Sequence, residues 1–495
     1  MVRPPPNLVR HCIWGARRID IGAKGRGAGA RHNVPGVPLP GREYRVTHRH
    51  PSPAWFAFAS LRTRQQGNRE VRQTIGQRQM RITDLRGVRI GGLVSGGLDS
   101  CTITHWLRAN GVEPHCYTLD LGQPDEPDLE SVRVRMLECG AVSAHVIDGR
   151  EALAEAGLSV IQSQARYEGG YWNTTGIARY VTTRLAIDAL KRDGISVLFH
   201  GATGRGNDQV RFQLATNMLA PTFQVYAPWR DPVMHDTFGG RKEMVEYSVA
   251  HSLPIKASVD KIYSTDANML GLTHEAGRLE ELATPATLVT PEMGVWGWDA
   301  PDAPGMIRIE WKNGRPVAID GDHVDLVEAF RRANEIGGAH GIGIGRHVVE
   351  NRFVGIKSRG VYEAPGMEVL GQAFEFLLQL YLDRRARELY ETLSRFLAVQ
   401  IYQGYWYDLG TTAALDAIAR YASLVSGTVI LRLSKGQVIF EGIEGVEDAP
   451  TLYSEDDASM ERAGSFDHAD AEGFLRVLGV PARNFANRMF PHLDR

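Results

Sequence analysis

One short segment of the chain has the composition of an anion-binding loop: residues 95–100 read SGGLDS. It directly follows an apolar run at 88–94 and precedes a helical pattern at 100–110. Glycine lets backbone N–H groups approach a bound group closely, and a helix N-terminus adds partial positive charge. The segment lacks the Gly-Lys-Ser/Thr ending of a P-loop and the three-glycine spacing of a dinucleotide-binding fold. We therefore expect a phosphate or pyrophosphate here, with an ordinary strand-to-helix turn as the alternative.

A second candidate loop lies at residues 201–212, which read GATGRGNDQVRF. It offers hydroxyl, amide, carboxylate and guanidinium groups within a small volume. Asn207 and Asp208 are expected to cap a helix that carries Arg211 one turn later. An amino-acid substrate needs a carboxylate for its ammonium group and donors for its own carboxylate. The loop is thus a candidate amino-acid site, and an N-cap followed by a surface arginine is the alternative.

Alternating strand and helix patterns would position both loops. Strands are expected at 88–94, 114–121, 143–148, 195–200 and 222–228, with helices at 100–110, 127–139, 177–193 and 241–251. This alternation predicts an α/β fold with a doubly wound parallel sheet, whose ligands bind at the carboxyl ends of the strands. Each candidate loop directly follows one of these strands.

Beyond about residue 253 the pattern changes and predicts a second domain. We expect a strand-turn-strand unit at 307–319, helices near 322–336 and from about 366 to 400, a hairpin at 428–440 and a short helix at 470–478. The predicted division is a basic leader at 1–79, a nucleotide-binding domain at 80–252, a second domain at 253–450 and a C-terminal arm at 451–495. The arm could act in an oligomer.

The composition is that of a soluble globular protein of 495 residues, with 43% hydrophobic and 23% charged residues. Neither a membrane-length apolar run nor a signal peptide is found in the sequence. The four cysteines show neither metal-ligand spacing nor a disulfide framework. We expect reduced thiols in a cytoplasmic enzyme, with no metal site built from its own residues and no nucleic-acid or membrane partner.

The first 79 residues are strongly basic, with 15 Lys and Arg against 3 Asp and Glu, whereas residues 80–495 carry a net charge of −14. A nucleic-acid-binding arm, an organelle transit peptide and translated upstream sequence are the three interpretations. Scarce serine argues against the transit peptide. We expect the natural start near Met80 and a dispensable or disordered leader.

Several further motifs, in order, resemble those of argininosuccinate synthases, members of the ATP pyrophosphatase (PP-loop) superfamily. They are Leu121-Gly122-Gln123, Tyr171-Trp172-Asn173-Thr174-Thr175, Ala227-Pro228-Trp229, Tyr263-Ser264-Thr265-Asp266, His274-Glu275-Ala276, Val349-Glu350-Asn351-Arg352 and Lys357-Ser358-Arg359-Gly360-Val361-Tyr362-Glu363. The resemblance covers residues 88 to about 475. It implies an adenine nucleotide alpha hydrolase-like domain, an α+β synthetase and oligomerisation domain, and a homotetramer.

The resemblance also implies an ATP-dependent ligase of arginine biosynthesis. Citrulline would attack ATP to give citrullyl-AMP and pyrophosphate, and aspartate would then displace AMP to form argininosuccinate. ATP is the implied co-substrate, with Mg²⁺. Such chemistry depends on positioning, charge stabilisation and exclusion of water from the adenylate.

The resemblance assigns site residues position by position. Those implied for the nucleotide are Leu93, Val94, Ser95, Gly96, Gly97, Leu98, Asp99, Ser100, Cys101, Leu119, Gly201 and Asp266. Those implied for aspartate are Thr203, Asn207 and Asp208, and those for citrulline are Tyr171, Asn207, Arg211, Ser264, Thr273, Glu275, Glu350 and Tyr362. Asp99, Asp208 and Arg211 are the catalytic candidates. Asp99 would organise Mg²⁺ or loop N–H groups, and Arg211 would clamp a carboxylate through two parallel hydrogen bonds.

The chain departs from the family pattern at four places. Cys101 replaces an oxygen donor and would weaken pyrophosphate binding by about one hydrogen bond, Gly176 stands where some members carry a serine, and Arg205 replaces a lysine. The segment 341–345 is one residue longer than usual. These departures affect the expected rate and specificity and leave the reaction class unchanged.

Three other functions remain open at this point. They are a paralogous PP-loop ligase that joins another ureido or amino acid, an ATP pyrophosphatase acting on tRNA or an amide, and a catalytically silent homologue. The acidic core argues against the tRNA enzyme. Intact loops at 95–100 and 201–212 argue against the silent homologue.

Overall fold

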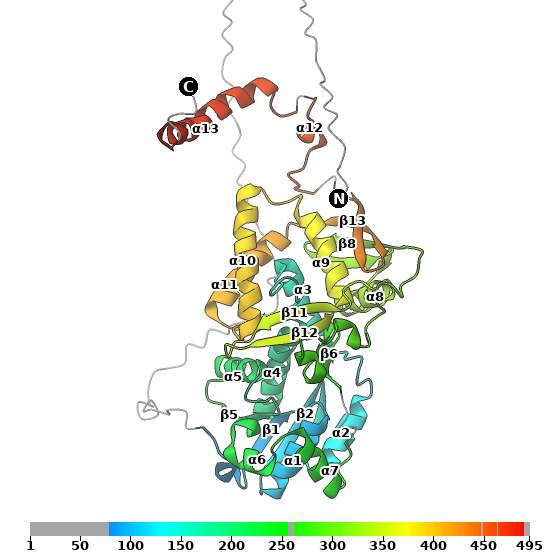
Figure 1. Cartoon of the computed structure of the whole chain (residues 1–495), viewed down its shortest axis with the longest axis vertical. Coiled ribbons are helices and arrows are strands. Elements are labelled where there is room, and N and C mark those ends of the chain that lie inside the picture. Colours follow the sequence, from blue (N-terminus) through cyan, green and yellow to red (C-terminus); the bar gives the residue numbers. More distant parts are fainter. Residues whose placement is uncertain (1–78, 256–261, 447–448, 463, 490–495) are drawn as a thin grey trace, which may run out of the picture. The chain divides into compact units, whose positions relative to one another are not determined.

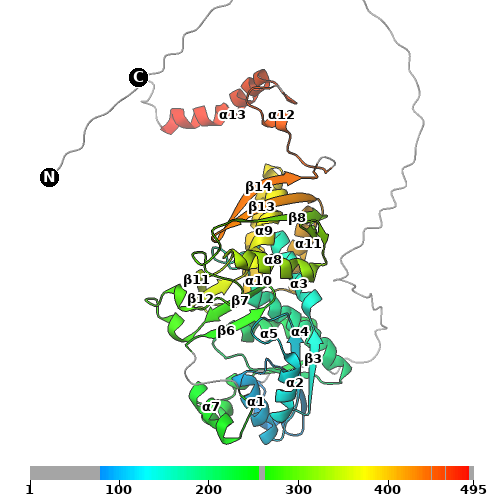
Figure 2. The same cartoon turned by 90° about the vertical axis from the view of Figure 1, so that its right-hand side faces the viewer.

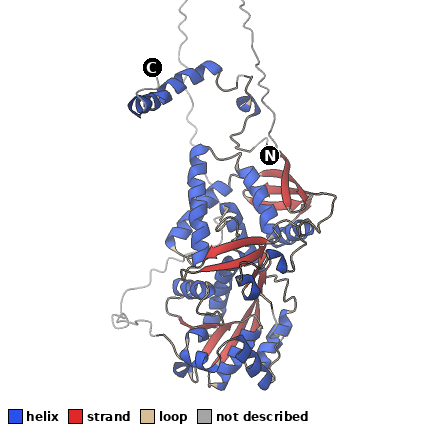
Figure 3. Cartoon of the chain, in the orientation of Figure 1, coloured by secondary structure: helices blue, strands red, loops and turns tan. Residues whose placement is uncertain are grey.

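The computed structural model describes residues 79–255, 262–446, 449–462 and 464–489 (Figure 1). Apart from Gln79, the predicted basic leader lies outside the described residues, as does the end of the predicted C-terminal arm. The described strands form three sheets, whose strands appear as three groups in Figure 3. Among the described residues, no helix combines the length and the apolar character needed to cross a membrane.

The first sheet is parallel, with strand order β3-β2-β1-β4-β5, as the alternating pattern predicts. Its strands are β1 (Arg89–Leu93), β2 (Glu113–Asp120), β3 (Ser143–Asp148), β4 (Val197–His200) and β5 (Gln224–Tyr226). The helices of this region are α1 (Leu98–Ala109), α2 (Leu129–Glu138), α3 (Arg150–Ser163), α4 (Thr174–Arg192), α5 (Asp208–Leu219), α6 (Pro232–Thr237) and α7 (Arg241–Ala250).

Helices cover both faces of this sheet, because successive side chains of a buried strand point in opposite directions. Cys116 of β2 packs with residues of α1 and α2, whereas the next residue, Tyr117, packs with residues of α4. The close fit of α4 depends on glycine: a Cβ on Gly91 would lie 1.9 Å from Leu190 Cδ2. The doubly wound α/β prediction is confirmed.

Two antiparallel sheets follow. One has the order β11-β12-β7-β6, and its strands are β6 (Ser264–Asn268), β7 (Gly271–Glu275), β11 (Arg346–Asn351) and β12 (Lys357–Glu363). The other has the order β10-β9-β8-β13-β14, and its strands are β8 (Gly305–Lys312), β9 (Arg315–Ile319), β10 (Asp322–His323), β13 (Gly427–Ser434) and β14 (Gln437–Glu444). The strand-turn-strand unit and the later hairpin are therefore confirmed.

The remaining helices include α8 (Leu326–Ala339), α9 (Pro365–Leu378), α10 (Arg384–Gln403), α11 (Leu409–Ala422), α12 (Glu455–Ala458) and α13 (His468–Met489). The first four contribute to one large apolar core with β8, β9 and β13, whereas α12 and α13 have no buried residue among those described. Helix α9 lies beside β13 in Figures 1 and 2. Phe374 of α9 packs on Trp311 of the neighbouring strand β8, with ring centroids 5.3 Å apart. Helix α3 joins the same large apolar core as α8 and α9.

Three predicted helices had wrong bounds. The helix expected from 366 to 400 is two helices, because Asp383 accepts a hydrogen bond from the Ala386 N–H and begins α10. Residues 322–323 are the short strand β10, and α8 begins only after its cap at Asp325. The short helix expected at 470–478 is longer in the structure: α13 runs from His468 to Met489 and contains Pro481 in its interior.

Candidate functional site

The sheet β11-β12-β7-β6 brings half of the predicted substrate residues, and Asp266 of the predicted nucleotide residues, onto one face. Tyr362 pairs with Thr273, which pairs in turn with Asp266 on the next strand. Residues that pair directly share a face, and every second residue of a strand returns to it. The register therefore places six predicted residues on this site face: Ser264, Asp266, Thr273, Glu275, Glu350 and Tyr362.

The loop at 95–100 joins β1 to α1, as the sequence predicts. The Ser95 N–H donates to Ser100 Oγ over 3.0 Å, which curls the loop over the helix N-terminus. Gly96 has φ +74°, a left-handed conformation that favours glycine. Its carbonyl accepts a hydrogen bond from Arg135 Nη1 at 2.8 Å. The open side of the loop is thus left to exposed Ser95 and Gly97.

Arg135, which the sequence analysis missed, supports this loop from below. Its side chain is buried, and its Nη1 atom also lies 3.5 Å from Glu126 Oε2. Arg135→Met is expected to lower the free energy of unfolding by about 1.5–3 kcal/mol, because a charged hydrogen bond to the Gly96 carbonyl is lost. Denaturant titration measures this change. Arg133→Met on the same helix removes only a solvent-exposed pair with Glu130 and is expected to leave the free energy of unfolding almost unchanged.

The two glycine-rich loops lie next to one another. A Cβ on Gly201 would lie 3.6 Å from Asp99 Cβ, so the second loop borders the first turn of α1. Asp99 Oδ1 accepts a hydrogen bond from Trp229 Nε1 at 3.1 Å. Burial raises the pKa of the Asp99 carboxyl, partly offset by the indole hydrogen bond and by Arg241. Asp99 is therefore a half-buried carboxylate at the junction of both loops.

Arg179 of α4 joins the second loop to the site face. Its guanidinium donates to Asp208 Oδ2 at 2.8 Å and forms an ion pair with Asp266 on β6. Burial alone would raise the pKa of Asp208, but Arg179 and Arg211 outweigh burial and lower it. Burial raises the pKa of Asp266, which Arg179 offsets only in part. The sequence analysis missed Arg179, whose role depends on contacts between distant segments.

Arg211 and Asn207 make different contacts from those expected. Arg211 Nε and Nη2 donate to the Tyr402 carbonyl at 3.1 and 2.9 Å, while Nη1 pairs with Asp208. The Asn207 side chain makes no capping hydrogen bond; it donates to the Tyr402 hydroxyl and accepts from the Phe353 N–H. The expected cap at Asn207 and the free carboxylate clamp at Arg211 are thus corrected. Both residues instead tie the second loop to α10.

Stacked tyrosines border the site face. The Tyr171 and Tyr362 rings stack with centroids 4.1 Å apart, and the Tyr171 hydroxyl accepts from the Thr175 N–H. Burial, with Glu350 nearby, raises the pKa of the Tyr362 hydroxyl well above its usual range. Glu350 is itself buried and accepts a hydrogen bond from Ser358 Oγ at 3.0 Å. Neutral hydroxyls and a buried carboxylate suit the recognition of an ammonium group.

Glu275 is a second carboxylate of the site face whose pKa is raised. Burial, together with repulsion from Asp208, Asp266 and Glu350, raises its pKa to about 7. A raised carboxyl pKa near a cluster of like charges indicates a place where a cation would be stabilised. The site thus has several carboxylates and few free cations, as an amino-acid ammonium requires.

Some predicted nucleotide residues have side chains that point into the core. These are Val94, Leu98, Cys101 and Leu119. The Cys101 thiol contacts the Gly96 carbonyl over 3.5 Å and is fully buried. The expectation that this thiol replaces an oxygen donor to pyrophosphate is therefore corrected. Leu93 is half-buried, whereas Thr203 is exposed on the second loop.

Comparison with known proteins gives one consistent family. Residues 92–254 match the model of the arginosuccinate synthase N-terminal HUP domain, and residues 263–485 match that of the arginosuccinate synthase C-terminal domain. The argininosuccinate synthase of Rhodopirellula baltica is 41% identical over 391 residues, covering 79% of this chain and 96% of that protein.

Two solved structures show weaker likeness. A predicted tRNA methyltransferase subunit of Methanocaldococcus jannaschii has a TM-score of 0.23 and 17% identity, covering 33% of this chain and 76% of its own. The tyrosyl-tRNA synthetase of Leishmania major has a TM-score of 0.16 and 14% identity, and the match covers 69% of this chain and 48% of the synthetase chain. The two family models and the Rhodopirellula relative place this chain in the argininosuccinate synthase family.

Proposed function

We propose that the protein joins L-citrulline and L-aspartate at the expense of ATP, releasing AMP, pyrophosphate and argininosuccinate, in arginine biosynthesis. Membership of the family supports this reaction. The observation that supports it most directly is the site face, where five residues expected to bind citrulline and one expected near the nucleotide, Asp266, share one side of a sheet. That face meets Asp208 of the second loop through Arg179.

The proposed chemistry has two steps. The ureido oxygen of citrulline attacks the α-phosphorus of ATP, a P–O bond to pyrophosphate breaks, and citrullyl-AMP forms. The aspartate amine then attacks the activated ureido carbon, AMP leaves with the oxygen, and the amine loses its proton. Positioning and charge stabilisation suffice for both steps.

We assign the residues to three substrates. The open side of the loop at 95–100 holds the ATP phosphates, with Gly201 and Asp266 on the nucleotide side. Thr203, Asn207 and Asp208 take aspartate, and Asp208 meets its ammonium group. The citrulline residues are Tyr171, Asn207, Arg211, Ser264, Thr273, Glu275, Glu350 and Tyr362. Because Arg211 is buried against Tyr402, we assign it a positioning role.

Mg²⁺ would enter with ATP. Within the described residues, no group of three or more His, Cys, Asp or Glu side chains could hold a metal ion. Mg²⁺ is commonly held by substrate phosphates and one or two carboxylates. Asp99, at the junction of the two loops, fits that single carboxylate. The ion would neutralise charge on the phosphates.

A cytoplasmic homotetramer is the proposed form of the protein. Helix α13 supports the assembly, because none of its described side chains is buried and it exposes apolar residues such as Phe474, Leu475 and Val477. We assign ATP binding to residues 80–252, synthetase and oligomerisation functions to 253–450, and an arm to 451–495.

The reaction is tested by pyrophosphate release from ATP with citrulline, with and without aspartate. AMP, pyrophosphate and argininosuccinate, identified by mass, are the expected products. Pyrophosphate released only with another acceptor would support a paralogous ligase instead. Absence of nucleotide cleavage with any amino acid would contradict the proposal.

The pKa of Glu275 predicts a pH-dependent citrulline KM. Because this pKa is raised to about 7, the carboxylate is mostly protonated at pH 6 and mostly ionised at pH 8. Only the ionised form attracts an ammonium group, so KM is expected to be about tenfold higher at pH 6 than at pH 8. Steady-state kinetics measure the profile. Glu275→Gln should flatten it, and a wild-type profile in this variant would contradict the assignment.

A further inference from the structure

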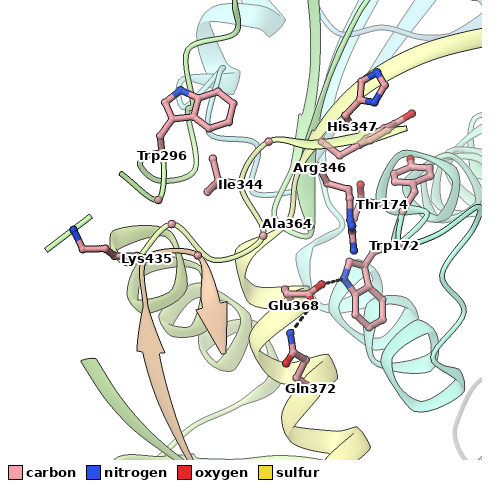
Figure 4. Close-up of a pocket in the computed structure, with 18 of the residues that line it drawn as sticks. Trp172, Thr174, Trp296, Ile344, Arg346, His347, Ala364, Glu368, Gln372 and Lys435 are labelled. Carbon is pink, nitrogen blue, oxygen red and sulfur yellow. Dashed lines mark hydrogen bonds between the residues drawn. The ribbon is translucent and has the colours of Figure 1, made fainter. Parts of the chain in front are cut away.

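The stacked rings of Tyr171 and Tyr362 form part of the wall of a cavity of about 710 Å³. Figure 4 shows other residues that line this cavity. Its lining comes from the segment before α4, the loop around Trp296, the glycine-rich segment at 341–345, the first residues of β11, the start of α9 and the β13–β14 turn. Of the predicted substrate residues, only Tyr171 and Tyr362 line it. The cavity is therefore separate from the loops at 95–100 and 201–212.

Arg346 and Glu368 line this cavity with opposite charges and form no ion pair with each other, whereas Lys435, which also lines it, is paired with Asp302. Arg346 has no carboxylate within 4.0 Å in the part of the chain that the structure describes. The Glu368 oxygens accept hydrogen bonds from two neutral donors, Trp172 Nε1 and Gln372 Nε2, each at 2.7 Å. Figure 4 shows the Arg346 guanidinium and the Glu368 carboxylate pointing into the same space. This arrangement leaves room for a ligand that carries both charges.

Aromatic and glycine residues shape the rest of the cavity. The Trp296 ring lies so close to Gly345 that a Cβ there would be 2.1 Å from Trp296 Cζ3. Trp296 stacks on Trp298 with centroids 4.9 Å apart. Flat aromatic faces beside a polar pair favour a ligand with a long side chain, since they bury methylene or cationic groups. The cavity volume is also within the range usual for small-molecule sites.

We propose that this cavity binds a zwitterionic α-amino acid with a long side chain, at a site distinct from the substrate site. Arg346 takes its carboxylate and Glu368 takes its ammonium group. The Tyr171–Tyr362 stack belongs both to this cavity and to the proposed citrulline site. An amino acid bound in the cavity therefore changes the affinity for citrulline through these two rings. The coupling to citrulline rests on the proposed function, whereas binding of the amino acid in the cavity does not.

The test uses the full chain, and each titration is done first without citrulline and then with saturating citrulline, because citrulline itself carries both charges and a long side chain. L-Lysine, L-arginine, L-glutamine and L-methionine are titrated separately by calorimetry and by tryptophan fluorescence. At least one is expected to bind saturably, with one site per chain and a fluorescence change that Trp296→Phe removes. The methyl ester of that amino acid, which lacks the carboxylate, should bind at least tenfold more weakly.

Two variants and a control assign the site. Arg346→Gln and Glu368→Gln are each expected to weaken binding at least tenfold while citrulline still binds. Arg278→Gln changes an exposed arginine outside the cavity and should bind as the wild type does. Failure of all four amino acids to bind, or binding that neither variant changes, would overturn the proposal. Melting temperatures confirm that the variants are folded.

The coupling to citrulline has its own readout. Saturation with the bound amino acid is expected to change the citrulline KM at least twofold in the wild type and to leave it unchanged in Arg346→Gln. An unchanged KM in the wild type would overturn the coupling even where binding is found. An enzyme without argininosuccinate synthesis would refute the proposed function while the binding experiment still decides the site.

Discussion

Gly96→Ala is expected to raise the ATP KM at least about tenfold. The residue has φ +74°, which costs a residue with a side chain about 1–2 kcal/mol. The new Cβ would also lie 2.7 Å from Val132 Cγ1 and 2.9 Å from Arg135 Nη1, so the support beneath the loop must shift. Since 1.4 kcal/mol corresponds to a tenfold change in affinity, these costs suffice to disorganise the phosphate loop.

Two alanine variants separate the causes of this effect. Gly194→Ala has φ +66° with open space around the Cβ, so it measures backbone strain far from the site. Gly97→Ala has ordinary backbone angles and a Cβ 3.6 Å from Ser95 Oγ, so it measures crowding on the open side of the loop. Steady-state kinetics and thermal melting are measured for all three. An unchanged ATP KM in Gly96→Ala would contradict the assignment of this loop to phosphate.

Asp208→Asn is expected to impair capture by aspartate about a hundredfold or more while sparing adenylation of citrulline. The variant removes the charge that would meet the aspartate ammonium group. It also leaves Arg179 and Arg211 without their shared carboxylate, which predicts lower stability as well. Asparagine is preferred to alanine because it keeps one oxygen as a hydrogen-bond acceptor.

The two half-reactions are measured separately. Citrulline-dependent exchange of pyrophosphate into ATP, without aspartate, reports adenylation, and argininosuccinate formation reports the complete reaction. Asp188→Asn changes an exposed aspartate of α4 and should leave both rates unchanged. An equal loss of both rates in Asp208→Asn would refute the role given to Asp208.

The sequence was sufficient to predict the parallel sheet and the placing of both loops, because strand and helix periodicities are local. It was not sufficient to predict the end of α9 near residue 378, since apolar residues continue through the break at 379–383. The capping residue Asp383, followed by its hydrogen bond to Ala386, is the signal that could have revealed the boundary.

The sequence was sufficient to name many residues of the candidate site, but not to predict how their side chains are arranged. The composition of the second loop indicated Asp208, and the family resemblance indicated Glu275. The positions of Arg135 beneath the first loop and of Arg179 between the second loop and the site face arise from tertiary packing. The raised pKa of Glu275 depends on burial and on three other carboxylates from separate segments. Such long-range electrostatics have no signature in local spacing.

The site face restricts the insertions that its strands can accept to even numbers of residues. Because its residues alternate with those of the opposite face, insertion of one residue within β11 or β12 would turn Glu350 or Tyr362 away from the site. The extra residue expected from the family pattern lies instead in the glycine-rich segment at 341–345, before β11 begins at Arg346. Variants of this protein should therefore remain active when residues are inserted or deleted in the segment 341–345. In β11 and β12, activity should survive only the insertion or deletion of two residues at a time.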